Sequence, residues 1–200
     1  MIFFYPNRPL LFSVDDPRIV SMGTDPNYDA EIKKNGTRLV LQKTKSPHPN
    51  KQGDFIFFNR QKEVLKYEPS KELMEELSKL RIPFESQLDG ELMHFKTKNL
   101  KHTIYFYDVY VLSGNLVTVN LEKRREILKD MFGDNKFKLI HISKQYKNGF
   151  IKLFKKVITE EENEGLVIKD KRGIISFTVT KSPDVAWQIK IRKPTKNYKH

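Results

Sequence analysis

The sequence contains no cysteine. This absence excludes disulfides, thiolate catalysis and cysteine-based metal sites. It also has no apolar run of the length that crosses a bilayer. The apolar start, residues 1–5, is cut short by Pro6 and lacks the basic beginning and sustained core of a signal peptide. We therefore expect a cytoplasmic protein that does not enter a membrane.

Several common enzyme patterns are missing as well. The sequence has no Gly-rich phosphate-binding loop, no Ser-His-Asp arrangement and no pair of histidines at metal-ligand spacing. What it has in excess is positive charge, with 37 basic against 25 acidic residues and a net charge of +12. Such an excess favours a polyanionic partner such as nucleic acid, although lysine-rich surfaces also aid solubility.

The 200 residues could form one large domain or two small ones. Loop signals occur at residues 15–17, 25–27, 46–50 and 181–184, but no linker separates two halves, so we expect a single domain over residues 1–200.

Three helices are predicted, one capped by Ser70, one capped by Asn120, and one from about 148 to 162. Short segments rich in aromatic and branched residues predict strands at Tyr28–Ile32, Arg38–Gln42, Asp54–Phe58, Leu88–Phe95, Thr103–Val111, Leu166–Lys169, Ile174–Thr178 and Trp187–Arg192. Strands dominate and helices interrupt them irregularly, which is typical of an α+β domain built on antiparallel sheets.

The segment Glu31-Ile32-Lys33-Lys34-Asn35-Gly36-Thr37-Arg38 carries the first chemical signal. A strand runs into Lys33, an Asn-Gly turn follows, and a second strand leaves from Arg38. Asn-Gly is a strong tight-turn signal, so this segment alone is explained by a plain β-hairpin with solvated lysines.

Four further segments each have an ordinary structural explanation when taken singly. They are a turn with two carboxylates (Asp89-Gly90-Glu91-Leu92), an aromatic strand (Tyr105 to Tyr110), an acidic residue before a buried strand (Glu164 to Lys169), and a strand that alternates apolar and basic residues (Trp187 to Lys193). Asp89 and Glu91 lie two residues apart and therefore share one face of a strand.

Taken together and in this order, the five segments resemble the signature motifs of the covalent nucleotidyltransferases, which include ATP-dependent DNA ligases, RNA ligases and messenger-RNA capping enzymes. Phe58-Asn59-Arg60 is similar to the short arginine motif of these enzymes, and Lys123 to Leu128 resembles the DNA-ligase sequence at the same place. The resemblance extends from about Tyr28 to Lys193. It implies an antiparallel-sheet nucleotidyltransferase fold, ATP-grasp-like and of the DNA-ligase catalytic type.

The resemblance also implies roles for individual residues. Lys33 would be the nucleophile that takes AMP from ATP, acting with Lys190 and Arg192. Glu91 would hold the ribose, Tyr107 would stack on adenine, and Glu31, Arg38, Lys169 and Lys190 would complete the nucleotide site. Glu164, together with Asp89, would bind Mg²⁺ or Mn²⁺. Arg38 and Arg60 would contact the ribose or the phosphates of the nicked strand. The net charge of +12, rather than the resemblance, suggests that lysines also hold nucleic acid: Lys43, Lys45 and Lys193, with further candidates at Lys51, Lys62, Lys196 and Lys199.

The sequence departs from the family pattern at three points. Asn35 stands where most DNA ligases have Asp, and Arg192 stands where Lys is usual. The sequence ends at His200, so we expect no C-terminal oligonucleotide-binding domain and no sixth basic motif that would help to expel pyrophosphate. A naturally minimal monomeric enzyme, one that needs an accessory protein, or a fragment of a longer protein would fit this pattern.

The expected activity is the sealing of a 5′-phosphate to a 3′-hydroxyl in a nicked DNA or RNA duplex. The Arg-Arg-Glu-Ile-Leu stretch and Trp187 favour DNA or mixed strands, whereas the missing domain is typical of several RNA ligases. A GTP-dependent capping guanylyltransferase and a non-catalytic nucleic-acid-binding domain are the remaining alternatives.

Overall fold

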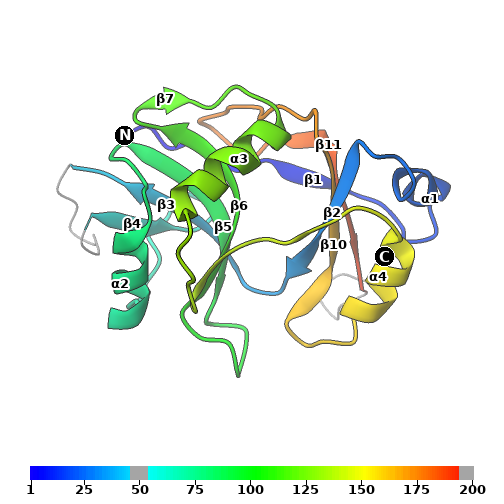
Figure 1. The fold of residues 1–200 in the computed structure, drawn as a ribbon, viewed down its shortest axis with the longest axis horizontal. Coiled ribbons are helices and arrows are strands. Elements are labelled where there is room, and N and C mark those ends of the chain that lie inside the picture. Colours follow the sequence, from blue (N-terminus) through cyan, green and yellow to red (C-terminus); the bar gives the residue numbers. More distant parts are fainter. Residues whose placement is uncertain (46–53, 194–200) are drawn as a thin grey trace.

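Two β-sheets lie side by side in the computed structural model, which describes residues 1–45 and 54–193 (Figure 1). The first sheet has the order β1 (Arg8–Leu11), β11 (Asp184–Arg192), β10 (Asn163–Asp170), β2 (Tyr28–Lys34) and β9 (Gln145–Tyr146). The second has the order β4 (Phe55–Phe58), β3 (Thr37–Lys43), β5 (Ser86–Met93), β6 (Thr103–Leu112) and β7 (Asn115–Leu116), and β8 (Ile140–Ile142) also pairs with β6. The β1–β11 and β6–β8 pairs are parallel, and the others are antiparallel. The predicted α+β class is confirmed.

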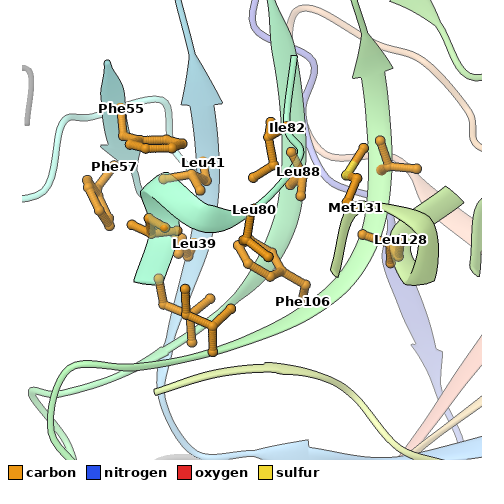
Figure 2. Close-up of a cluster of buried hydrophobic side chains, with 14 of the residues drawn as sticks. Leu39, Leu41, Phe55, Phe57, Leu80, Ile82, Leu88, Phe106, Leu128 and Met131 are labelled. Atoms are coloured by element: carbon orange, nitrogen blue, oxygen red, sulfur yellow. The ribbon is translucent and has the colours of Figure 1, made fainter. Parts of the chain in front are cut away.

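One face of the second sheet packs on α2 (Lys71–Lys79) and α3 (Leu121–Phe132). Figure 2 shows this core, in which strand residues such as Leu39, Leu88 and Phe106 meet Leu80, Leu128 and Met131. Helix α2 begins where the sequence predicts, because the Ser70 hydroxyl accepts a hydrogen bond from the backbone N–H of Leu73 at 3.2 Å. Asn120 caps α3 in the same way.

One face of the first sheet packs on α1 (Pro17–Met22) and α4 (Phe150–Val157). The buried residues of this second core include Ile19, Phe150, Phe154, Leu166 and Ile191. Side chains alternate across a strand, so the residues between these apolar positions point to the other face of the sheet. None of the helices within residues 1–45 and 54–193 is long and apolar enough to cross a membrane.

Strands β2 and β3 do not form the plain hairpin that Asn35-Gly36 suggests. Strand β2 pairs with β10 and β9 in the first sheet, whereas β3 pairs with β4 and β5 in the second. A Cβ on Gly36 would lie 2.6 Å from the carbonyl oxygen of Leu92, so only glycine fits at this crossing. The turn therefore joins the two sheets and leaves Lys33 at the boundary between them.

Two predictions on secondary structure need correction, and the sequence patterns miss one helix. The loop signal at residues 15–17 leads directly into this helix, α1, which Asp16 caps and Pro17 opens. The third helix ends at Val157 instead of near 162, since a run of glutamates from 160 to 162 is unfavourable at a helix C-terminus. Residues 174–178 form no strand. The backbone of Ser176 is hydrogen-bonded by the Asn7 side chain, and the Thr178 carbonyl accepts from the Tyr5 N–H, so these groups do not pair with a neighbouring strand.

A buried arginine on α3 connects the two sheets. The Arg124 side chain is fully buried, and its Nε donates to Asp108 Oδ1 on β6 at 2.7 Å. Its Nη1 donates to the Gly173 carbonyl at 2.9 Å, in the segment between β10 and β11. The guanidinium also lies 5.2 Å from the ring centroid of Trp187 on β11. Arg124 therefore contacts both sheets at once.

Replacing Arg124 with alanine should destabilise the fold strongly, because it leaves the Asp108 carboxylate buried without its partner. We expect a loss of about 3–5 kcal/mol in the free energy of unfolding, measured by urea denaturation. The neighbouring Lys123 has a side chain 62% exposed and pairs with Glu126 on the surface, so Lys123→Ala should cost less than about 1 kcal/mol. Equal losses for the two variants would contradict the connecting role of Arg124.

Candidate active site

A cleft of about 700 Å³ lies where the open faces of the two sheets meet. Residues of β2, β10 and β11 line it from the first sheet, and residues of β3, β5 and β6 line it from the second. The cleft brings together ten residues that the sequence motifs predict: Glu31, Lys33, Arg38, Asp89, Glu91, Tyr107, Glu164, Lys169, Lys190 and Arg192.

Lys33 forms an ion pair with Glu164 inside the cleft, through Nζ and Oε2. Their side chains are 25% and 19% exposed, so both can still be reached from solvent. Glu164 points here because β10 is irregular at its start: Asn163 pairs with Lys34 and Gly165 pairs with Lys33, so Glu164 is an extra residue. Such a bulge turns the side chain of the extra residue to a new direction.

The bulge also requires glycine at residue 165. Its φ is +152°, and a Cβ there would lie 2.1 Å from the carbonyl oxygen of Ile191. The backbone of β11 therefore approaches β10 closely at the point where Glu164 turns into the cleft.

The adjacent lysine has a different environment. Lys34 Nζ donates to Asn163 Oδ1 at 2.9 Å and lies 5.0 Å from the ring centroid of Tyr105. Because neighbouring side chains of a strand point to opposite faces, Lys34 does not line the cleft. The structure thus separates two lysines that the sequence places side by side.

Arg38 and Lys169 bring positive charge to the ring of Tyr107. The Arg38 guanidinium is held by both carboxylate oxygens of Asp89 and lies 5.6 Å from the ring centroid. Lys169 Nζ lies 5.5 Å from the same centroid. Burial raises the pKa of Tyr107 well above its ordinary value, so the ring stays neutral. A neutral aromatic ring in a cationic cleft suits a flat, anionic ligand.

Glu31 is buried at the back of the cleft, with 2% of its surface exposed. Its carboxylate lies 3.0 Å from Lys169 Nζ and 3.5 Å from Arg125 Nη1. Despite these short ionic contacts, neither oxygen accepts a well-aligned hydrogen bond within the described residues. Both therefore keep acceptor capacity for a ligand, since buried polar atoms are normally satisfied.

Arg125 does not line the cleft, but it contacts residues that do, and the sequence motifs do not indicate this. It lies on α3 next to Arg124, donates to the carbonyl oxygens of Tyr107 and Ser143, and faces Glu31. The consecutive arginines in a helix that resembles DNA ligases are the available signal, but helical periodicity does not show that both are buried.

The electrostatics of the cleft perturb two further groups. Burial raises the pKa of the Glu91 carboxyl to about 7, although Lys33 and Arg38 oppose this shift. Glu91 also accepts a hydrogen bond from the N–H of Gly36 at 3.1 Å. Burial, with the nearby charges of Lys33 and Arg192, lowers the pKa of Lys190.

The remaining predicted residues fall in different places. Arg60 lines the cleft from the turn after β4. Lys43 and Lys45 lie away from it, at the other end of β3, where both approach the ring of Phe84 at 5.0 and 5.4 Å. Lys193 and Lys62 do not line the cleft either. Three further candidates, Lys51, Lys196 and Lys199, lie outside the described residues.

The two carboxylates predicted as metal ligands differ in availability. Both oxygens of Asp89 are engaged by Arg38, whereas Glu164 is paired with Lys33 through one oxygen and remains partly exposed. In residues 1–45 and 54–193 no three acidic or histidine side chains cluster as a complete metal site. A divalent cation would therefore need ligands from a bound molecule in addition to Glu164.

Comparison with known proteins identifies the fold. Residues 94–179 match the family model of the ATP dependent DNA ligase domain. No curated protein matches the sequence significantly. Among solved structures, mycobacterial DNA ligase D in complex with ATP superimposes with a TM-score of 0.64 at 14% identity, over 94% of this chain and 60% of that one. A Lig E DNA ligase gives 0.60 at 12%, over 96% and 70%. The ligase of bacteriophage T7 in complex with ATP gives 0.58 at 16%, over 94% and 68%.

These similarities define the class of protein. The chain has the fold of the nucleotidyltransferase domain of ATP-dependent DNA ligases, and the resemblance predicted from its motifs is confirmed. It spans 60–70% of the length of these three relatives.

The raised pKa of Glu91 predicts a pH-dependent effect on stability. Its folded-state pKa of about 7 lies above the ordinary value of 4.5, so its contribution to stability is largest below pH 4.5 and is lost as the pH rises through 7. The uncharged Glu91→Gln variant avoids this loss. Between pH 5 and 8 its stability relative to the unmodified chain should rise by up to about 3 kcal/mol in urea unfolding, at about 1.4 kcal/mol per pKa unit.

Glu75→Gln, on the exposed face of α2, is the matched control for replacing one glutamate by glutamine. Parallel curves for Glu91→Gln and the unmodified chain would show that the carboxyl does not ionise near pH 7.

Proposed function

We propose that this chain is the catalytic domain of an ATP-dependent polynucleotide ligase that carries AMP on Lys33. The convergence of Lys33, Glu164 and Lys190 in one cleft, with an aromatic ring and a buried acceptor beside them, is the observation that carries this proposal. Lys33, Glu164 and Lys190 come from three different strands, and the fold brings them together in the cleft. Lysines that only make the surface soluble would not be expected to converge in this way.

In the first step, the Lys33 amine in its neutral form attacks the α-phosphorus of ATP. A nitrogen–phosphorus bond forms, the bond from the α-phosphorus to the bridging oxygen breaks, pyrophosphate leaves with the electron pair, and the nitrogen releases one proton to solvent. Lys190, next to Lys33 in the cleft, would contact the oxygens of the α-phosphate, and Arg192 would add positive charge.

The rest of the cleft would hold the nucleoside. Tyr107 offers an aromatic ring for stacking on adenine, and Glu91 offers a carboxyl for the ribose hydroxyls. Glu31 has two buried oxygens without well-aligned donors, which suits the exocyclic amine of adenine. Arg38, fixed by Asp89, would lie against the ribose, and Lys169 holds Glu31 in place.

Glu164 would hold a divalent cation together with phosphate oxygens of the nucleotide, which is a common arrangement for Mg²⁺. The cation would neutralise phosphate charge during the transfer. Asp89 would contribute only if it released Arg38, so Glu164 is the stronger candidate. Loading the nucleotide would also free Lys33 from Glu164, because the carboxylate would gain a new partner.

In the later steps AMP would pass from Lys33 to the 5′-phosphate of a nicked strand, forming a phosphate–phosphate linkage. The 3′-hydroxyl would then attack that 5′-phosphate, forming a phosphodiester and releasing AMP. The net charge of +12 supports a nucleic-acid substrate, and the DNA-ligase fold favours DNA or mixed strands over RNA. Nicked duplexes in every combination of DNA and RNA strands, offered with ATP or GTP, distinguish these substrates.

Lys33 and Lys34 provide a matched test of the nucleophile. Lys33→Ala should reduce transfer of label from α-labelled ATP by at least about 1,000-fold, because no covalent intermediate can form. Lys34→Ala should retain transfer within a few-fold, since Lys34 bonds Asn163 on the other face of the strand. Mass spectrometry that finds AMP on another lysine would refute the mechanism.

Glu164 is expected to act through the metal. Glu164→Ala should raise the Mg²⁺ concentration needed for half-maximal AMP transfer by roughly tenfold or more, as the loss of a carboxylate ligand implies. Its stability should change little, because the carboxylate is partly exposed. The exposed Glu161→Ala is the control and should behave as the unmodified chain. Undiminished transfer by Glu164→Ala at limiting Mg²⁺ would reject the role.

A further inference from the structure

The loop between β5 and β6, residues 94–102, borders the cleft. It lies at the end of the second sheet where β4 and β5 end and where the turn from Lys33 enters β3. Figure 1 shows this loop extending beyond the end of the sheet. Arg60, on the turn after β4, lies at the same end, so the loop and Arg60 flank the nucleophile turn.

The loop is held by contacts of its own. The Thr97 hydroxyl donates to the Leu100 carbonyl at 2.6 Å, and Lys101 Nζ donates to the His94 carbonyl at the same distance. The rings of His94 and His102 pack with centroids 4.4 Å apart, and the Tyr67 hydroxyl lies 2.8 Å from His102 Nδ1. These contacts order the loop, and among the residues that the structure describes they leave the side chains of Phe95 and Lys96 free of hydrogen bonds.

Phe95 and Lys96 are presented to solvent from this ordered base. Phe95 is 51% exposed, and its ring packs perpendicular to that of His94, with the two ring centroids 5.0 Å apart. Lys96 is exposed and lines the cleft. Within residues 1–45 and 54–193 Lys96 forms no hydrogen bond or ion pair. Its positive charge acts on the Glu91 carboxyl and lowers the pKa of that group, against the larger effect of burial.

We propose that Phe95 and Lys96 form a contact for the nucleic-acid strand that crosses the mouth of the cleft. Lys96 would bind a phosphate close to the nick, and Phe95 would pack on a neighbouring sugar or base. Pairing an exposed ring with a cation fits a polynucleotide better than the departing pyrophosphate, which has no apolar surface for Phe95. The inference rests on the proposed function and adds a substrate-binding surface to it.

The test measures duplex binding and AMP transfer separately. The affinity of the full chain for a nicked DNA duplex is measured by fluorescence anisotropy at several salt concentrations, with Phe95→Ala, Lys96→Ala, Lys96→Arg and Lys152→Ala. Lys96→Ala should weaken binding about fivefold at 0.1 M salt and reduce the slope of log K against log salt by about one unit. Lys96→Arg should restore both values. Phe95→Ala should weaken binding about fivefold or more with an unchanged slope, since stacking does not release ions.

Lys152, exposed on α4, is the control for loss of one positive charge and should leave binding unchanged. Wild-type affinity in Phe95→Ala and Lys96→Ala would overturn the proposal. So would a Lys96→Ala variant that raises the KM for ATP while binding the duplex normally, because Lys96 would then serve the nucleotide. Failure of the unmodified chain to form lysyl-AMP would instead refute the proposed function, and the duplex affinities would still be measured.

Discussion

The ion pair between Arg124 and Asp108 is buried at the place where the two sheets meet, and the geometry of the cleft depends on it. Arg124 bonds β6 through Asp108 and the segment before β11 through Gly173. Its neighbour Arg125 faces Glu31 on β2 and bonds the backbone of Tyr107 on β6. Two consecutive side chains of one helix thus fix the separation between the wall that carries Glu31 and the wall that carries Tyr107. A buried charge is costly without its partner, so the sheets cannot separate here without a large loss of stability.

The cleft itself is a set of paired charges. Lys33 is paired with Glu164, Arg38 with Asp89, and Lys169 with Glu31. The three pairs differ in burial: Glu31 and Lys169 are almost fully buried, whereas Lys33 and Glu164 are partly exposed. In the Arg38–Asp89 pair only the arginine is partly exposed, whereas in the Lys33–Glu164 pair both side chains are, so a charged ligand can reach both members of that pair. This gradient gives the proposed nucleophile and metal ligand the freedom that the supporting residues lack.

Much of the secondary structure follows from local chemistry. Ser70 and Asn120 cap helices where predicted, and the alternation of apolar and basic residues before Lys193 places Lys190 and Arg192 on one face of β11. The errors occur where a distant contact overrides a local pattern. Residues 174–178 look like a strand, but the Asn7 side chain and the Tyr5 N–H bond them from the other end of the chain.

The sequence by itself determined the motifs, their order and the alternation of faces along each strand, because these depend on residues a few positions apart. Only the tertiary structure decided which of those residues meet. Asn35-Gly36 has the composition of a hairpin turn, yet it crosses between the sheets, at a point where a Cβ on residue 36 would lie 2.6 Å from the carbonyl oxygen of Leu92. Glu164 faces Lys33 because β10 has a bulge at this residue. The bulge brings Gly165 close to the backbone of Ile191 on β11, and the residues next to Gly165 in the sequence do not predict this approach. The contact between Arg125 and Glu31 also depends on tertiary structure. Packing between segments that are distant in the sequence fixes the position of Arg125, and no local sequence pattern predicts it.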